Sequence, residues 1–222
     1  WHYQAPFFSK HFQVVTLDNR GVGASDKPEA PYTTGMMAED AVGLLDSLGI
    51  EKAHIMGASM GGMIAQELAI NHPERVMRLV LACTYARPEM KTGDGSGRLS
   101  GSPKERMGAV LSLAFNKPLY RLVFGTFARL RTIPEGSPLA IGIEGQSAAV
   151  ATHDTLDRLN SITAETLVIV GTGDRLIDPH ASEVIASRIS GAKLVKIAGG
   201  SHTFMMENSG EFNREVLKFL KD

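Results

Sequence analysis

Five segments of this chain are short, apolar and rich in β-branched residues, and they alternate with longer segments in which apolar residues recur every three to four positions. Short apolar segments closed by turn residues are typical of parallel strands buried on both faces, and the longer period is that of amphipathic helices. We therefore predict an α/β fold, a mainly parallel sheet flanked by helices. The predicted strands are residues 12–18, 53–57, 79–83, 166–171 and 193–197.

The longer segments predict the helices of this fold. Gly49 follows the first and Pro73 the second, and both residue types are typical of helix ends. Asn208 or Ser209 is the expected N-cap of the last one. The predicted helices are residues 37–48, 61–71, 181–189 and 212–220.

Residues 85–160 break the alternation. They begin with a Gly- and Ser-rich stretch at 91–102, which we expect to be a mobile loop and the first site of proteolysis. Three helices are predicted after it, at residues 103–115, 118–130 and 137–151. An all-helical insertion between two strands is most simply a lid, so we divide the chain into core (1–84), lid (85–160) and core again (161–222).

The segment Gly57-Ala58-Ser59-Met60-Gly61 connects a predicted strand to a predicted helix and contains the pattern Gly-x-Ser-x-Gly. On such a strained strand-to-helix turn the serine hydroxyl stands clear of the sheet, and neighbours without side chains fit around it. The helix that follows directs backbone N–H groups toward any oxyanion formed there. The alternative is a Gly-rich turn with no chemical role, but the position between strand and helix favours a nucleophile.

At this point the chain resembles the α/β-hydrolase superfamily, and most of all its small carboxylesterases, lactonases such as 3-oxoadipate enol-lactonase, and cofactor-free haloperoxidases. Besides the serine turn, the resemblance rests on residues 18–25 (DNRGVGAS) and on His72-Pro73-Glu74-Arg75-Val76 before the strand at 79–83. It covers nearly all of the chain and is weakest in the lid. Family members often have His before the serine, where this chain has Ala58.

His202 is the predicted base, because a serine hydroxyl needs a neighbouring base to become a good nucleophile. It lies in Gly199-Gly200-Ser201-His202, directly after a predicted strand, and this loop matches the catalytic histidine loop of the family. Asp174, after the strand at 166–171, is the predicted acid that orients His202. Asp178 is the competing acid, although a turn or helix-capping role suits it better. The order Ser, Asp, His is the one that this fold produces.

The remaining histidines have other expected roles among the seven in the chain. We expect His180 to face solvent at a helix start and His72 to mark a helix end. His54, inside a strand, is expected to be a core histidine with its hydrogen bonds satisfied. His153, beside Asp154 at the end of the lid, is a weaker candidate for lining the pocket.

The predicted reaction is hydrolysis of a carboxylic ester or lactone, a small-molecule substrate. Ser59 attacks the carbonyl, His202 moves the proton, Asp174 orients His202, and the Met60 backbone N–H stabilises the oxyanion. Hydrolysis of a carbon–carbon bond and cofactor-free perhydrolysis use the same triad and stay open as alternatives. A ligand-binding, receptor-like member of the fold is the alternative that is not an enzyme.

Several classes of site and partner are not expected. The sequence has no clustered Cys/His spacing for a metal, the loop around Asp94 lacks the further carboxylates of a calcium site, and Gly21-Val22-Gly23 lacks the third glycine of a dinucleotide motif. We therefore expect no metal and no cofactor. A net charge of −1 argues against a nucleic-acid surface, and no apolar run reaches the roughly 20 residues of a membrane span. Cys83, the single cysteine, is expected in the core; its lack of a disulfide partner fits the cytoplasm.

The sequence begins at Trp1, whereas members of the resembled family begin with two or three strands before this point. The third of those strands would lie between residues 12–18 and 53–57 and would carry the second oxyanion donor. We therefore expect a preceding segment of roughly 30–50 residues, or a second chain, to complete the sheet. Without it, the protein should be a poor catalyst with at most half an oxyanion hole.

Overall fold

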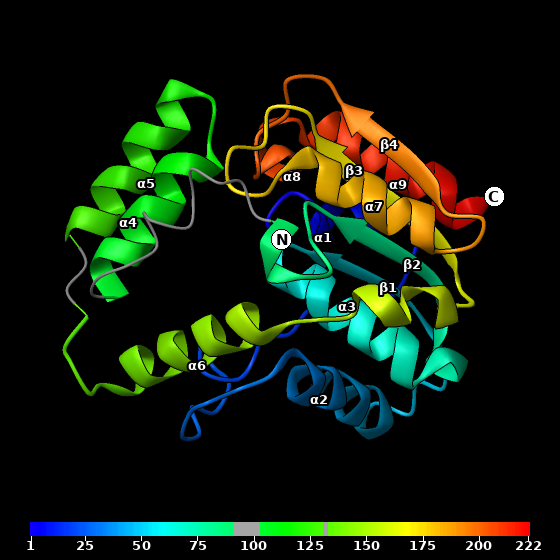
Figure 1. The fold of residues 1–222 in the computed structure, drawn as a ribbon, viewed down its shortest axis with the longest axis horizontal. Helices are drawn as coiled ribbons and strands as arrows, with labels where there is room; N and C mark the ends of the chain where they lie inside the picture. Colours follow the sequence, from blue (N-terminus) through cyan, green and yellow to red (C-terminus); the bar gives the residue numbers. More distant parts are fainter. Residues whose placement is uncertain (91–102, 131–132) are drawn as a thin grey trace.

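The computed structural model describes residues 1–90, 103–130 and 133–222, and the predicted loop at 91–102 lies outside them. Its strands form a parallel sheet in the order β1-β2-β3-β4 (Figure 1). This arrangement confirms the predicted parallel α/β architecture, and four of the five predicted strands are present within a few residues of their expected bounds. The strands are β1 (Ala53–Ala58), β2 (Val76–Ala82), β3 (Glu165–Gly171) and β4 (Lys193–Ile197).

Each predicted helix is also present. Helix α2 begins at Thr34, three residues before its predicted start, because the Thr33 side chain accepts the N–H of Met36 and caps it. The α-helices are α1 (Ala5–Phe8), α2 (Thr34–Ser47), α3 (Met60–Asn71), α4 (Pro103–Ala114), α5 (Pro118–Leu130), α6 (Pro138–Thr152), α7 (Pro179–Arg188), α8 (Phe204–Glu207) and α9 (Ser209–Lys221). Short 3₁₀ helices lie at η1 (Pro73–Arg75), η2 (Pro88–Met90) and η4 (Leu156–Ser161).

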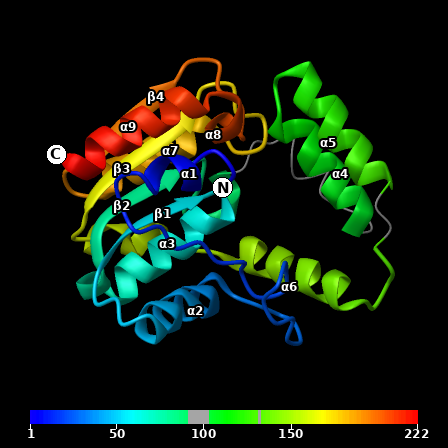
Figure 2. The same ribbon diagram turned by 180° about the vertical axis from the view of Figure 1, so that it is seen from behind.

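Helices cover both faces of the sheet (Figures 1 and 2). Successive side chains of β2, such as those of Leu79 and Val80, point to opposite faces, because a strand has a two-residue period. Leu79 packs in a core with α2, α3 and α7, and Val80 packs in a second core with α1, α8 and α9. Because all strands are parallel, the loops after β1, β2, β3 and β4 leave the same edge of this two-sided core.

Two parts of the predicted lid differ in how they meet the rest of the molecule. Helices α4 and α5 form a hairpin that stands apart from the sheet in both views (Figures 1 and 2). Helix α6 packs closely on the loop that precedes α2. If Gly142 carried a side chain, its Cβ atom would lie 1.8 Å from the Gly21 carbonyl oxygen. A Cβ atom added at Gly145 would lie 2.5 Å from the Tyr32 ring. The region predicted to be a lid thus consists of a hairpin and a separately packed helix.

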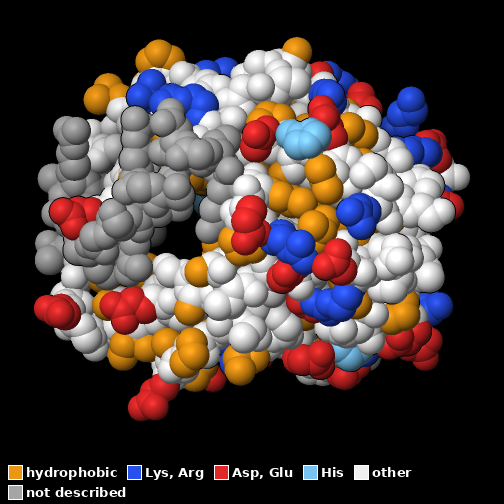
Figure 3. All heavy atoms as spheres, in the orientation of Figure 1, with side chains coloured by type: hydrophobic (Ala, Val, Ile, Leu, Met, Phe, Trp, Pro, Cys, Tyr) orange, Lys and Arg blue, Asp and Glu red, His pale blue; other side chains and the backbone are white. Residues whose placement is uncertain are grey.

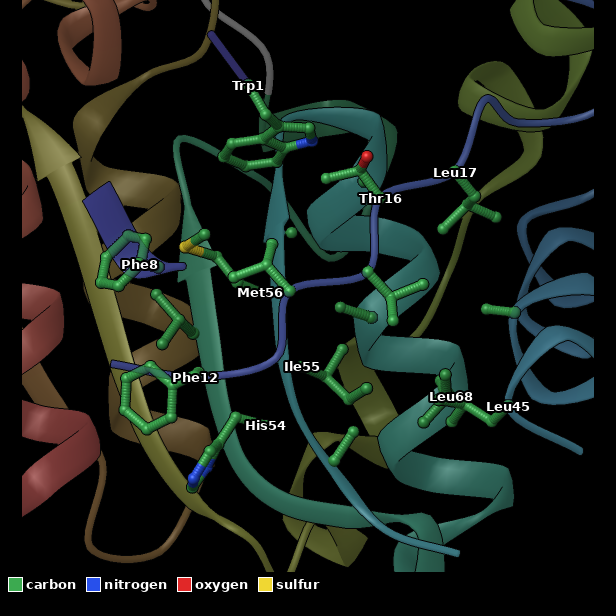
Figure 4. A pocket seen from close by; sticks show the side chains of 18 of the residues that line it. Trp1, Phe8, Phe12, Thr16, Leu17, Leu45, His54, Ile55, Met56 and Leu68 are labelled. Atoms are coloured by element: carbon green, nitrogen blue, oxygen red, sulfur yellow. The ribbon is translucent and has the colours of Figure 1, made fainter. Parts of the chain in front are cut away.

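The predicted strand at residues 12–18 is wrong. Residues 13–17 make no backbone hydrogen bond with any described residue, and Val14, Val15 and Leu17 are 37%, 39% and 41% exposed. These residues and β1 both line a cavity of about 450 Å³. In Figure 4, Trp1 lies at one end of this cavity and His54 at the other. A strand needs a hydrogen-bonded neighbour, and no described strand lies on this side of β1. The added segment or second chain that would supply one stays a prediction.

The right half of the surface shown in Figure 3 carries acidic and basic side chains next to one another. This intermixing, with a net charge of −1, differs from the dense basic face that phosphate binding requires. Among residues 1–90, 103–130 and 133–222, the helices are too short or too polar to cross a membrane.

Candidate active site

Ser59 lies between the end of β1 and the start of α3, in a strained backbone conformation. Its φ of 53° and ψ of −122° are rarely adopted by a residue with a side chain. The neighbouring strand holds it there: the Ser59 N–H donates to the Ala82 carbonyl (2.9 Å), and the Thr84 hydroxyl donates to the Ser59 carbonyl (2.9 Å). The turn predicted from Gly-x-Ser-x-Gly is therefore present, and β2 braces it.

The glycines around Ser59 are not equally constrained. A Cβ at Gly57 would lie 2.0 Å from the Gly61 carbonyl oxygen, and one at Gly62 would lie 2.6 Å from the Thr84 side chain. A Cβ at Gly61 would meet no atom within 4 Å. The close packing of the turn thus requires Gly57 and Gly62, whereas the sequence pattern had indicated Gly57 and Gly61.

The structure brings Ser59, His202 and Asp174 together. The His202 Nε2 atom is 3.0 Å from the Ser59 Oγ, and its Nδ1 is 2.7 Å from the Asp174 Oδ2. The other carboxylate oxygen of Asp174 accepts the backbone N–H groups of Leu176 (2.8 Å) and Ile177 (3.0 Å). Since a carboxylate oxygen only accepts, the His202 Nδ1 carries a proton, and its Nε2 is left to accept the Ser59 hydroxyl hydrogen.

Asp178 does not contact His202. Its side chain accepts the His180 N–H (2.9 Å) and caps α7, the role expected for it in the sequence. His180 lies at the exposed start of α7, beside Glu183. His72 follows α3 and lies 2.7 Å from a Glu39 oxygen.

Two other histidines differ from expectation. His54 has a buried Nδ1 atom with no hydrogen-bond partner among the described residues, so it is not a satisfied core histidine; burial lowers its pKa. His153 is 2% exposed and lies between the hydroxyls of Thr34 (2.9 Å) and Thr155 (3.3 Å), so it does not line an open pocket. Burial lowers the pKa of His153 from 6.5 to about 4.

Backbone N–H groups at the start of α3 lie next to Ser59. The Ser59 carbonyl accepts the N–H groups of Gly62 (2.9 Å) and Met63 (3.3 Å). No described residue accepts a hydrogen bond from the Met60 N–H. The first N–H groups of a helix have no partner within the helix and attract negative charge. The predicted oxyanion donor therefore has its N–H free at the start of a twelve-residue helix.

Cys83 and Thr84, which directly follow β2, are parts of the site that sequence reasoning did not find. Cys83 has a φ of 40°, again rare for a residue with a side chain, and its N–H donates to the Ile169 carbonyl. Burial, followed by the charge of Asp174, raises the pKa of the Cys83 thiol well above its usual range, which makes it a poor nucleophile. No local pattern marks these residues, because their contacts are with β1 and β3.

No group of three or more His, Cys, Asp or Glu side chains in the described part of the chain is arranged to hold a metal ion. The polar groups at the site instead pair with one another, in the line from Asp174 through His202 to Ser59. This line suits proton transfer from a hydroxyl to an imidazole with a carboxylate behind it.

Comparisons with known proteins identify the fold family and several hydrolases that resemble this chain. A family model described as alpha/beta hydrolase fold matches residues 1–123 and 91–209. A protein of Caulobacter segnis provisionally named carbamate hydrolase RutD is 28% identical, over 100% of this chain and 86% of its own. The 2-hydroxymuconate semialdehyde hydrolase of Pseudomonas sp. strain CF600 is 31% identical, over 100% of this chain and 81% of its own. The crystal structure of the enol-lactonase from Burkholderia xenovorans LB400 superimposes with a TM-score of 0.85 at 29% identity, over 100% of this chain and 86% of that one.

Proposed function

This chain belongs to the alpha/beta hydrolase fold family, and we propose that it hydrolyses a carboxylic ester or a lactone through a covalent intermediate on Ser59. The observation that carries the proposal is the unbroken line of hydrogen bonds from Asp174 through His202 to Ser59. Similarity to other hydrolases supports an enzyme over a ligand-binding protein of the same fold.

In the first step, the Ser59 Oγ attacks the substrate carbonyl carbon and passes its proton to the His202 Nε2. Asp174 stabilises the imidazolium that results, and its two bonds to backbone N–H groups hold it in place. The Met60 N–H is the proposed donor to the oxyanion, supported by its position at the start of α3 without another acceptor.

In the following steps, the His202 Nε2 returns the proton to the leaving alcohol, and Ser59 retains the acyl group. A water molecule then loses a proton to the same nitrogen and attacks the acyl carbon; the bond to Ser59 breaks, the Ser59 Oγ takes the proton back from His202, and the acid is released. Each step uses the 3.0 Å approach of His202 to Ser59. The reaction therefore needs only the groups that the structure brings together and water.

A second candidate is hydrolysis of a carbon–carbon bond, which the 31% identical 2-hydroxymuconate semialdehyde hydrolase favours. Carbamate hydrolysis, named for the Caulobacter relative, would use the same acyl transfer to Ser59 with a different leaving group. We place the ester or lactone first because its leaving group is an alkoxide that the His202 proton neutralises, whereas a carbon leaving group departs as a carbanion and needs stabilisation beyond Ser59 and His202. The free, buried Cys83 supports a proposed location in the cytoplasm.

The test is a substrate panel measured with the wild-type protein and with Ser59→Ala. The panel contains p-nitrophenyl acetate and butyrate, a γ-lactone, a phenyl carbamate and 2-hydroxy-6-oxo-6-phenylhexa-2,4-dienoate, the compound named for another relative. We expect the highest kcat/KM on an ester or the lactone and no turnover with Ser59→Ala. A dienoate rate above that of every ester and lactone would move the proposal to carbon–carbon cleavage. Undiminished turnover by the alanine variant would refute Ser59 as nucleophile.

A further inference from the structure

The turn between α4 and α5 contacts the two loops that carry Asp174 and His202. The Asn116 side-chain amide donates to the Gly173 carbonyl (3.0 Å) and to the Gly199 carbonyl (3.4 Å). Gly173 directly precedes Asp174, and Gly199 lies in the loop that leads to His202. One side chain of the hairpin thus bridges the acid loop and the base loop.

Glu207 holds the same turn from the other side. This residue ends α8, is 8% exposed, and its carboxylate accepts the backbone N–H groups of Asn116 (3.2 Å) and Lys117 (2.7 Å). No Lys or Arg in the described ranges forms an ion pair with this carboxylate, although the Lys117 ammonium donates to the Glu207 carbonyl. Hydrogen bonds from N–H groups to an ionised carboxylate are stronger than neutral ones. The Glu207 charge is therefore directed at the backbone of the turn.

Thr203 adds a third connection, directly after His202 in the chain. Its N–H (3.1 Å) and its hydroxyl (2.8 Å) both donate to the Ala114 carbonyl at the end of α4. Figures 1 and 2 show that the α4–α5 hairpin stands apart from the sheet and approaches the body beside α8. The hydrogen bonds from residues 114–116 to the acid and base loops thus lie at positions that flank Asp174 and His202.

We propose that Asn116 and Glu207 are positioning residues, which fix the His202 loop against the Asp174 loop by fastening both to the α4–α5 turn. The inference rests on the proposed function, because it concerns the same three catalytic groups. Asp174 is held by the N–H groups of its own loop, at Leu176 and Ile177. The His202 loop is joined directly to the Asp174 loop by the Gly173 N–H to the Gly200 carbonyl (2.8 Å) and the Gly199 N–H to the Thr172 hydroxyl (2.8 Å). The hairpin adds a second set of bonds to the same loop, at Gly199 and Thr203. A displacement of about 1 Å at His202 would cost about 100-fold in rate.

The first test is Glu207→Gln, with Glu211→Gln as the matched control. An amide at position 207 turns its NH₂ group toward one of the two backbone N–H groups that the carboxylate accepts. Glu211 lies four residues away, exposed in the first turn of α9, and undergoes the same loss of charge. We expect kcat of Glu207→Gln to fall about 10- to 100-fold with KM nearly unchanged, and kcat of the control to stay at the wild-type value.

The second test is Asn116→Asp, with exposed Asn160→Asp as the control. The new carboxylate would face the carbonyl oxygens of Gly173 and Gly199 and could donate to neither. We expect the same loss in kcat as for Glu207→Gln, while the control keeps its rate. Asn116 lies in a turn and not in the core of the sheet, so this variant tests the proposal even where Glu207→Gln folds poorly.

A proton NMR measurement separates positioning from stability. The Nδ1 proton of His202, held by Asp174, should resonate far downfield in the wild type and be lost in Asp174→Asn. We expect the signal to weaken or shift in Glu207→Gln and Asn116→Asp at temperatures where both are folded. Variants that melt earlier but keep kcat and the downfield signal would overturn the positioning role. Because the signal is read without substrate, it still tests the role if Ser59→Ala refutes the proposed function.

Discussion

His202 and His153 are both buried imidazoles beside a hydroxyl, and the difference between them shows what the candidate active site adds. The His202 Nε2 is 3.0 Å from the Ser59 hydroxyl, and the His153 Nδ1 is 2.9 Å from the Thr34 hydroxyl. His202 also contacts the Asp174 carboxylate, whereas the second partner of His153 is the Thr155 hydroxyl. Both sites thus contain a hydroxyl–imidazole pair. Of these two imidazoles, only the one paired with Ser59 also contacts a carboxylate among the described residues.

The two histidines also carry their protons on opposite nitrogens. The Thr155 hydroxyl donates to the Gln66 side-chain carbonyl (2.6 Å), so it accepts from His153, whose proton is on Nε2. His202 carries its proton on Nδ1, where Asp174 accepts it. A carboxylate faces His202, whereas burial opposes protonation of His153 and lowers its pKa. We therefore expect proton transfer from the hydroxyl of Ser59 and not from that of Thr34.

The largest expected effect comes from replacing His202 by glutamine, and His153→Gln is its matched control. His202→Gln removes the proton acceptor of Ser59 and should reduce kcat by about 10⁶-fold, the scale known for the base of a serine triad. His153→Gln should leave kcat within a few-fold of wild type, because its partners are Thr34 and Thr155. Steady-state kinetics on the best ester measures both. Comparable losses of kcat in the two variants would contradict the distinction between the His202 and His153 sites.

Removing the negative charge behind His202 should have the next largest effect. Asp174→Asn offers an amide that favours the wrong imidazole tautomer, and we expect a loss of about 10⁴-fold in kcat. Asp178→Asn makes the same change at the cap of α7 and should alter kcat little, since asparagine also caps helices well. An equal or greater loss in the Asp178 variant would transfer the role of acid to that residue.

His153 should make the folded protein sensitive to acid. Its pKa of about 4 in the folded protein lies below the ordinary 6.5, so the unfolded chain binds the proton first as the pH falls. Its contribution to stability is complete above about pH 6.5, declines by up to about 3 kcal/mol toward pH 4, and is constant below that. The difference in unfolding free energy between wild type and His153→Gln, measured by urea titration at several pH values, should shrink across this range. A difference that does not change with pH would contradict the burial argument.

The smallest expected effect concerns the hydroxyl beside His153. Thr34→Val leaves the buried Nδ1 without a donor and should reduce the unfolding free energy by about 1–3 kcal/mol while kcat is unchanged. Thermal and urea unfolding measure the first part, and ester turnover measures the second. A fall in turnover without a fall in stability would connect His153 to the chemistry after all.

Local patterns in the sequence predicted the parts of this structure that depend on neighbours along the chain. Ser59, Asp174 and His202 each lie in a short loop after a strand, and the common edge of a parallel sheet brings such loops together. Asn116 and Glu207 escaped prediction because they are 91 residues apart and interact with backbone groups. No spacing rule detects a contact of that kind.

The strand predicted at residues 12–18 failed for a related reason. Its apolar residues fit a strand covered on both faces, but strand formation depends on a hydrogen-bonded neighbour, which a local pattern does not report. The glycine pattern was partly misleading as well: Gly62, outside Gly-x-Ser-x-Gly, packs against Thr84, a residue 22 positions later in the sequence.

Covalent labelling with a fluorophosphonate tests the central claim most directly, because this probe reacts with a serine that a neighbouring base has activated. The account predicts one added phosphonyl group by intact mass, located on Ser59 by peptide mapping. Labelling should be absent in Ser59→Ala, strongly slowed in His202→Gln and Asp174→Asn, and unchanged in His153→Gln. A label on a different residue, or ester turnover by a protein that takes up no label at Ser59, would contradict the account.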